Sequence, residues 1–210
     1  MNFLSFQHTF AQFPVISILE IEKAFPGFDQ NALTRWQRKG YLEKIRSGYY
    51  RLASRPISGE GESFFIANRI YNPSYVSLQS AMSWYGFIPE GVFTVTSIST
   101  RKTQVFETSL GQFSYRSIRR ELFFGYRLVS FGNIRVKIAD PEKTLLDFLY
   151  LNPHLDSAAH FFELRLNMWE LGAKVRIEKI NKYLKLFNSK ALTSRVNKFT
   201  QFLESNAVTF

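Results

Sequence analysis

Residues 15–52 constrain the fold of this chain more than any other stretch, because turn-forming residues divide it into two short helices and a hairpin. An apolar-faced helix is predicted over residues 17–25, and it stops at Pro26-Gly27, a pair that breaks helices. A second helix is predicted over residues 30–39. Asp29 supplies its N-cap oxygen.

Gly40 ends this second helix, and a basic hairpin is predicted after it. Residues 41–45 and residues 49–52 are short β-like runs, and Arg46-Ser47-Gly48 joins them with a glycine where a turn needs a positive φ. The order helix, turn, polar helix and basic hairpin predicts a winged helix-turn-helix. A DNA-binding protein is therefore the first hypothesis.

The second helix has two unlike faces when its residues are placed at 100° intervals. Leu33, Trp36 and Gly40 fall on the side predicted to pack on its neighbour. The opposite side, with Lys39 at its edge, carries residue types that read base edges and phosphates: Asn31, Thr34, Arg35 and Arg38. A solvated polar face is the alternative. Three basic residues of the hairpin favour DNA instead, namely Lys44, Arg46 and Arg51.

Charge supports a polyanionic partner, because the chain carries a formal net charge of +10. Residues 1–56 hold 8 Lys/Arg and 4 Asp/Glu, residues 57–164 hold 10 of each, and residues 165–210 hold 9 and 3. The excess positive charge therefore lies at the two ends. This pattern suggests either a long DNA footprint or a second nucleic-acid contact.

Composition excludes several classes of site. The chain has no Cys, so disulfides, thiolate metal sites and Cys nucleophiles are excluded. No apolar run reaches 18 residues, and the N-terminus lacks a charged segment followed by a long apolar core. We therefore expect a soluble cytoplasmic protein with no membrane partner.

Two domains are predicted, 1–56 and 57–210, because residues 53–61 combine small residues, a Pro and two Gly in a linker-like run. The second domain is predicted to be α+β. Helices are expected over residues 63–71, capped by Ser63, and over residues 75–85. A small antiparallel sheet should follow from residues 92–100 and 112–118 and from a hairpin over residues 126–139, which turns at Gly132-Asn133.

The remainder is predicted to be a helical bundle. Asp140-Pro141-Glu142 is a helix start, with a cap, a Pro at the first position and an acid in the first turn. Residues 161–171 carry two apolar stripes, so that helix is expected to be buried on both sides. The last two helices are amphipathic, and their basic side chains should point outward: Arg176, Lys179, Lys182, Lys185, Arg195 and Lys198.

No residue constellation in the sequence indicates an enzyme. His154, His160 and Glu163 match no metal-ligand spacing, so neither a metal nor a cofactor is predicted. Asp140, Glu142 and Lys143 resemble a nuclease centre in residue type but not in spacing. A nuclease targeted by the winged helix is kept as an alternative, and so is a regulator whose second domain senses a small ligand.

Four blocks of the chain resemble the AbiEi-type antitoxins of type IV (abortive-infection) toxin–antitoxin systems. Residues 33–50, LTRWQRKGYLEKIRSGYY, are similar to that family's helix and "R-x-G-x-Y" hairpin. Residues 73–89, PSYVSLQSAMSWYGFIP, are similar to its "P-S-Y-V-S-L-x-S-A-L-x-x-Y-G" block. Further on, Phe123-Phe124-Gly125 and residues 138–147, IADPEKTLLD, look like "F-x-G" and "I-A-x-P-E-K-A-L-L-D".

The resemblance implies a transcriptional repressor that binds inverted repeats in its own promoter. It also implies an antitoxin that counteracts a nucleotidyltransferase-like toxin without forming a stable complex. By the same resemblance, the residues in the major groove would be Asn31, Thr34, Arg35 and Arg38. The wing would carry Lys44, Arg46, Ser47 and Tyr49. For four residues of the second block, a functional surface and core packing both remain open: Tyr75, Ser77, Ser80 and Tyr85.

Overall fold

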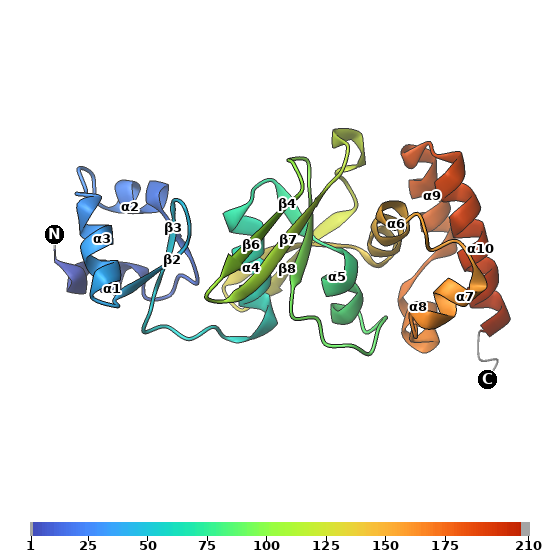
Figure 1. Cartoon of the computed structure of the whole chain (residues 1–210), viewed down its shortest axis with the longest axis horizontal. Helices are drawn as coiled ribbons and strands as arrows, with labels where there is room; N and C mark the ends of the chain where they lie inside the picture. The colour runs from blue at the N-terminus through green and yellow to red at the C-terminus, as the bar shows by residue number, and fades with distance from the viewer. Residues whose placement is uncertain (1, 207–210) are drawn as a thin grey trace.

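The computed structural model describes residues 2–206 and is mixed α and β, with ten α-helices and two sheets in that range. Figure 1 shows an elongated arrangement, with a small N-terminal unit at one end, a larger sheet in the middle and a group of helices at the other end. No helix within residues 2–206 has the length and apolar character needed to span a membrane.

The N-terminal unit comprises residues 3–52 and packs three helices on a three-stranded antiparallel sheet of order β1-β3-β2. Its elements, in chain order, are α1 (Phe3–Phe10), β1 (Ile16–Ser17), α2 (Ile18–Ala24), α3 (Asn31–Arg38), β2 (Leu42–Arg46) and β3 (Tyr49–Leu52). Helix α1 was not predicted from the sequence. Its buried Phe6 and Phe10 contribute to the core of this unit together with Trp36.

Local signals explain the start of α2 and the turn of the hairpin. Ser17 and Glu20 form a reciprocal capping box, in which each side chain bonds the backbone N–H of the other. Between β2 and β3, Gly48 takes a φ of +82°, which a glycine adopts without strain. The predicted hairpin is confirmed, although Arg46 belongs to β2 and Tyr41 precedes that strand.

Three details of the first prediction are corrected. Helix α3 starts at Asn31, one residue later than expected. The N-cap position is Gln30 and not Asp29, although the carboxylate of Asp29 accepts a hydrogen bond from the Asn31 backbone N–H at 2.9 Å. Gly40 is exposed instead of packing on the neighbouring helix.

The predicted linker is shorter than expected, because α4 (Gly59–Ile70) already begins inside it. Ser63 therefore lies within the helix and does not cap it. A glycine fits at position 61 because the ring of Phe131 lies against it and leaves no room for a Cβ atom. Glu62 accepts hydrogen bonds from Arg55 at 2.9 Å and from the Ser58 backbone N–H at 2.8 Å, which ties the remaining linker to the helix.

The helix predicted over residues 75–85 is wrong in its first part. β4 (Ser74–Val76) is a strand, and α5 (Leu78–Trp84) follows it almost directly. Leu78 adopts a φ of +57° at this sharp junction, a conformation that costs a non-glycine residue about 1–2 kcal/mol. Burial of the Leu78 side chain in the core offsets that cost.

The central sheet has six strands in the order β6-β7-β5-β4-β9-β8. It is larger than the sheet we expected, and it is mixed, because β5 pairs with β7 and β4 pairs with β9 in parallel. The hairpin of β8 and β9 is confirmed. The remaining bounds are β5 (Val95–Ser99), β6 (Gln104–Thr108), β7 (Gly111–Ser117), β8 (Tyr126–Phe131) and β9 (Ile134–Ala139), with a 3-10 turn η1 (Arg120–Leu122).

Helices cover both faces of this sheet. Ser74 of β4 points to α4, and the next residue, Tyr75, points to α6 (Pro141–Leu151) on the other face. Helix α5 packs beside α6. Two C-terminal helices, α9 (Ile177–Phe187) and α10 (Lys190–Asn206), pack on α6, and α7 (Ala158–Glu163) packs on α10. Helix α8 (Met168–Lys174) lies between α7 and α9 in the chain.

The predicted helix over residues 161–171 is in fact two helices. Arg165 takes a φ of +48° after α7, and the backbone N–H of Asn167 donates to the Phe87 carbonyl at 2.9 Å. This tertiary bond holds the break, and the Asn167 side chain then caps α8. The second apolar stripe is consequently not buried, since Phe162 and Trp169 are exposed.

The N-terminal unit is fastened to the central sheet by a shared group of buried side chains, which we call the junction cluster. Val15 and Ile45 come from the N-terminal unit. The other members come from α4, its C-cap residue Tyr71, and β7: Ile66, Ala67, Ile70, Tyr71, Phe113 and Tyr115. Because these side chains are buried together, the two parts of the chain share a core and are not separated by a free linker.

Candidate nucleic-acid interface

The polar face of α3 is presented to solvent. The opposite face of the helix is buried through Ala32, Leu33 and Trp36. The Trp36 ring lies 4.9 Å from that of Phe6, 5.3 Å from that of Phe3 and 5.8 Å from that of Phe28 between centroids, so the helix cannot rotate about its axis. The exposed side carries all five predicted contact residues: Asn31, Thr34, Arg35, Arg38 and Lys39.

One acidic residue lies on this face. The carboxylate of Asp29 is 3.0 Å from a guanidinium nitrogen of Arg35, and both side chains are more than half exposed. The hydrogen bond from Asn31 N–H and the nearby Arg35 hold the pKa of Asp29 below its usual range. An exposed ion pair of this kind contributes little to stability, so the guanidinium can exchange its partner.

The predicted wing residues divide into two groups. Lys44 and Ser47 of the hairpin are exposed to solvent. Arg46 and Tyr49 are half-buried, and Tyr49 packs against the junction cluster. The guanidinium of Arg46 donates to the carbonyl of Ile70 in α4. The structure therefore does not bring Arg46 and Tyr49 together with the exposed face of α3.

Arg51, which we expected to add to the basic hairpin, is buried. Its guanidinium lies 2.9 Å from the carboxylate of Glu43 on the neighbouring strand and also donates to the carbonyl of Arg55. A two-residue turn at Ser47-Gly48 alone would place Lys44 opposite Arg51. A register shift between Lys44 and Arg46 brings Glu43 there instead, so the turn residues of the sequence did not announce this pair.

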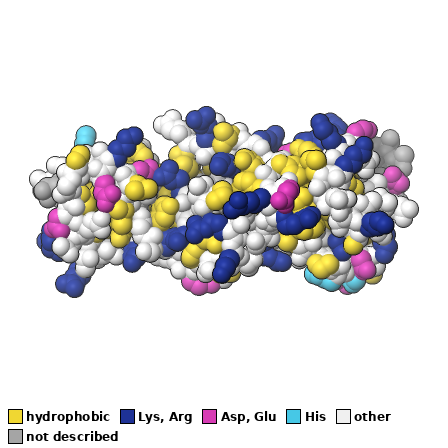
Figure 2. All heavy atoms as spheres, turned by 90° about the horizontal axis from the view of Figure 1, so that it is seen from above, with side chains coloured by type: hydrophobic (Ala, Val, Ile, Leu, Met, Phe, Trp, Pro, Cys, Tyr) yellow, Lys and Arg dark blue, Asp and Glu magenta, His cyan; other side chains and the backbone are white. Residues whose placement is uncertain are grey.

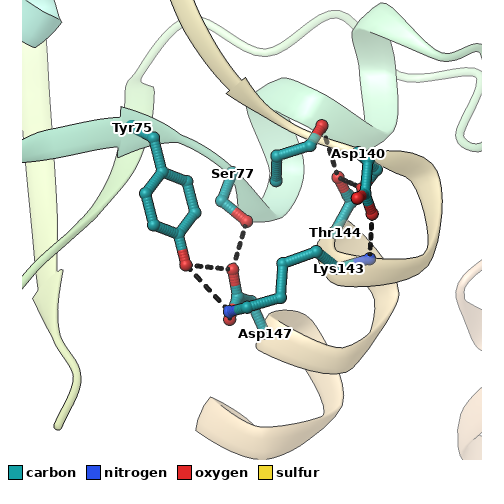
Figure 3. A network of polar contacts seen from close by, with 7 residues as sticks. Tyr75, Ser77, Asp140, Lys143, Thr144 and Asp147 are labelled. Atoms are coloured by element: carbon teal, nitrogen blue, oxygen red, sulfur yellow. Dashed lines mark hydrogen bonds and ion pairs between the residues drawn. The ribbon is translucent and has the colours of Figure 1, made fainter. Parts of the chain in front are cut away.

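The motif residues of the second domain form a buried polar network between β4 and α6, shown in Figure 3. Tyr75 and Ser77 each donate a hydrogen bond of 2.9 Å to the Asp147 carboxylate. The ammonium of Lys143 donates to the Tyr75 hydroxyl at 2.8 Å and to the other Asp147 oxygen. These contacts favour core packing over a functional surface for Tyr75 and Ser77.

Electrostatics in this network follow from burial. Lys143 and Asp147 have no exposed side-chain surface. Burial raises the pKa of Asp147 and lowers that of Lys143, because each charge has lost its water. Burial and the adjacent Asp147 raise the pKa of Tyr75 well above its usual value, so Tyr75 remains a neutral donor. The rings of Tyr75, Phe124 and Phe187 surround the ammonium at 5.1–5.4 Å.

Asp140 and Glu142, the carboxylates of the nuclease alternative, connect α6 to α9. Asp140 caps α6 as predicted and accepts a hydrogen bond of 2.7 Å from the Tyr183 hydroxyl. Lys179 lies 3.0 Å from Asp140 and 2.9 Å from Glu142. Lys143 points away from them into the network with Asp147. The three residues of the supposed centre therefore face different partners.

The other polar candidates also have structural partners. Ser80 donates to the Thr94 carbonyl at 3.1 Å, and Tyr85 donates to the Ala139 carbonyl at 2.8 Å. His160 lies beside Asp156 and Ser157 in its own helical turn. Among residues 2–206, no three His, Asp or Glu side chains are grouped so that they could hold a metal ion.

Basic side chains also gather on the C-terminal helices. Figure 2 shows Lys and Arg side chains along the whole length of one face of the molecule. In α9 and α10 most of the predicted apolar positions are buried, although Ile177 is exposed and Leu203 is half-buried. Most basic residues of these helices point outward. Arg195 is an exception, because it is buried and donates to the Leu149 carbonyl at 2.9 Å. Its position therefore corrects the expectation that it faces solvent.

Comparison of the chain with models of known protein families and with curated proteins finds no match. What the protein does is therefore inferred from its own residues.

Proposed function

We propose that the N-terminal unit is a winged helix-turn-helix and that α3 reads double-stranded DNA in the major groove. The observation that carries this proposal is the exposed face of α3, where guanidinium, amide and hydroxyl groups are held outward by a buried aromatic face. Arg pairs with guanine and Asn with adenine at such a surface. The order of helices and strands in residues 3–52 also supports it.

In this proposal the contact set is smaller than the one expected from the sequence. Asn31, Thr34, Arg35 and Arg38 contact bases or phosphates in the groove. Lys39, Lys44 and Ser47 contact the adjacent backbone. Arg46 and Tyr49 do not take part, because their side chains already bind the second domain.

The biological role that fits this reader is a transcriptional repressor acting on inverted repeats in its own promoter. The resemblance in four sequence blocks supports a further role as a type IV antitoxin that opposes a nucleotidyltransferase-like toxin. Co-expression with a nucleotidyltransferase-like toxin that arrests growth tests that role, since the proposal predicts that growth is restored. Continued growth arrest would contradict it.

DNA binding is tested by fluorescence anisotropy with the DNA upstream of this gene and with a scrambled duplex. We expect sequence-selective binding that weakens steeply with salt, because bound phosphates release their counterions. The Arg35→Ala/Arg38→Ala double variant should bind at least about tenfold more weakly. Arg120→Ala/Arg135→Ala removes the same charge from exposed positions elsewhere and serves as the matched control. Equal losses in both double variants would overturn the assignment to α3.

A further inference from the structure

We infer that Arg46 is a positioning residue, which locks the N-terminal unit onto the central sheet and so fixes the direction in which α3 is presented. Its position in a basic hairpin suggests a phosphate contact. Its surroundings assign it to the second domain instead. Only the DNA-binding part of this inference rests on the proposed function.

The guanidinium of Arg46 lies among three aromatic rings. Its central carbon is 4.6 Å from the ring centroid of Phe106 in β6, 5.8 Å from that of Tyr49 and 5.9 Å from that of Tyr71. Two of these rings belong to the second domain. A planar guanidinium stacks on aromatic faces and is less strongly hydrated than an ammonium, so a lysine would not replace it here.

The same guanidinium also closes the end of a helix. It donates to the carbonyl of Ile70, the last residue of α4. Carbonyls in the last turn of a helix lack partners within the helix, and the helix dipole places partial negative charge on them. Arg46 satisfies one such carbonyl with a cation, and this bond joins the hairpin to α4 directly.

Two further polar contacts join the N-terminal unit to the second domain. Glu20 of α2 pairs with Arg69 of α4. The hydroxyl of Ser109 donates to the carboxylate of Glu43 at 3.1 Å. Beneath them, Ile45, the neighbour of Arg46 in β2, is buried in the junction cluster. The contact is therefore apolar at its centre and is oriented by directional polar bonds at its edge.

Distances between two spin labels test this lock. The chain has no Cys, so Thr9→Cys in α1 and Gln79→Cys in α5 place single labels on exposed positions of the two parts. We expect one narrow distance distribution in the parent protein and at least a twofold broader one in Arg46→Ala. Lys44→Ala, which removes a charge from an exposed position of the same strand, should leave the distribution narrow. An equally narrow distribution in Arg46→Ala would overturn the inference.

A second pair of variants guards against a folding defect at position 46. Phe106→Leu removes the ring that lies closest to the Arg46 guanidinium, and this ring belongs to β6 of the second domain and not to the N-terminal unit that carries α3. It should broaden the distribution to a similar extent, and the double variant Arg46→Ala/Phe106→Leu should be no broader than either single variant. Independent, additive broadening would show that the two side chains do not act together.

The salt dependence of DNA binding distinguishes positioning from phosphate contact. Loss of one phosphate contact lowers the slope of log affinity against log salt by about one. We expect that change in Lys44→Ala and no change of slope in Arg46→Ala. A reduced slope in Arg46→Ala would overturn the positioning role. If the parent binds no DNA, the proposed function fails, and the label distances alone decide whether Arg46 locks the junction.

Discussion

The carboxylate of Asp29 lies 3.0 Å from the guanidinium of Arg35, so the exposed face of α3 carries its own acidic partner for a predicted DNA contact. In the proposed complex, DNA has to displace this carboxylate before Arg35 can bind a base or a phosphate. Asp29 also accepts the Asn31 N–H bond at the start of the helix. One side chain thus orders α3 and competes for its arginine.

Asp29→Asn should strengthen DNA binding by a factor of about two to five, because an exposed ion pair of modest strength no longer competes for Arg35. Asparagine keeps the oxygen that accepts the Asn31 N–H bond, so the melting temperature should hardly change. Anisotropy titrations and thermal melts of both proteins check this. Weaker binding by the variant would mean that Asp29 holds Arg35 in its reading position.

Trp36→Ala should destabilise the N-terminal unit by about 3–5 kcal/mol, the range for removing a buried aromatic side chain. Only 7% of the Trp36 residue surface is exposed, and it contacts the rings of Phe3, Phe6 and Phe28. Denaturant unfolding measures the loss. Arg38→Ala, on the exposed face of the same helix, is the control. Its unfolding midpoint should lie at the same denaturant concentration as that of the parent protein.

Asp147→Ala should cost about 3–5 kcal/mol, because it leaves the buried ammonium of Lys143 without its counter-charge. The double variant Lys143→Met/Asp147→Ala removes both charges and should recover part of that loss. Unfolding free energies of the parent, both single variants and the double variant complete the cycle. If the double variant were as unstable as the sum of the single variants, the two side chains would not be coupled.

Stability should fall in acid partly through Glu62. Hydrogen bonds from the Arg55 guanidinium, opposed by burial, hold its pKa below the ordinary value of 4.5. The unfolded chain therefore binds this proton more readily. The stabilisation is complete above about pH 4.5 and is lost as the pH falls through the folded-state pKa. Melting temperatures of the parent and Glu62→Gln should differ at pH 7 and converge at low pH; a constant difference would assign the effect to packing.

Local patterns in the sequence were sufficient to predict those helices and strands whose signals lie within a few residues. The capped start of α6 and the hairpin of β8 and β9 are as predicted, and most of the apolar positions predicted for α9 and α10 are buried. The outward face of α3 also followed from periodicity, because a helix buried on one side by Leu33 and Trp36 must expose the other side.

Contacts between residues far apart in the chain decided the pairing of the central sheet and the orientation of two arginines. Residues 74–76 form a strand because β5 and β9 pair with them. Three residues are too few for periodicity to distinguish such a strand from the start of the helix that follows it. Parallel pairing joins strands far apart in the chain, so no local turn signal announces it. Arg46 and Arg51 are basic in sequence like Lys44, but the rings and carboxylates brought near them turn them inward. The sequence by itself thus determined which helix face is polar, and only the tertiary structure decided which charges remain free.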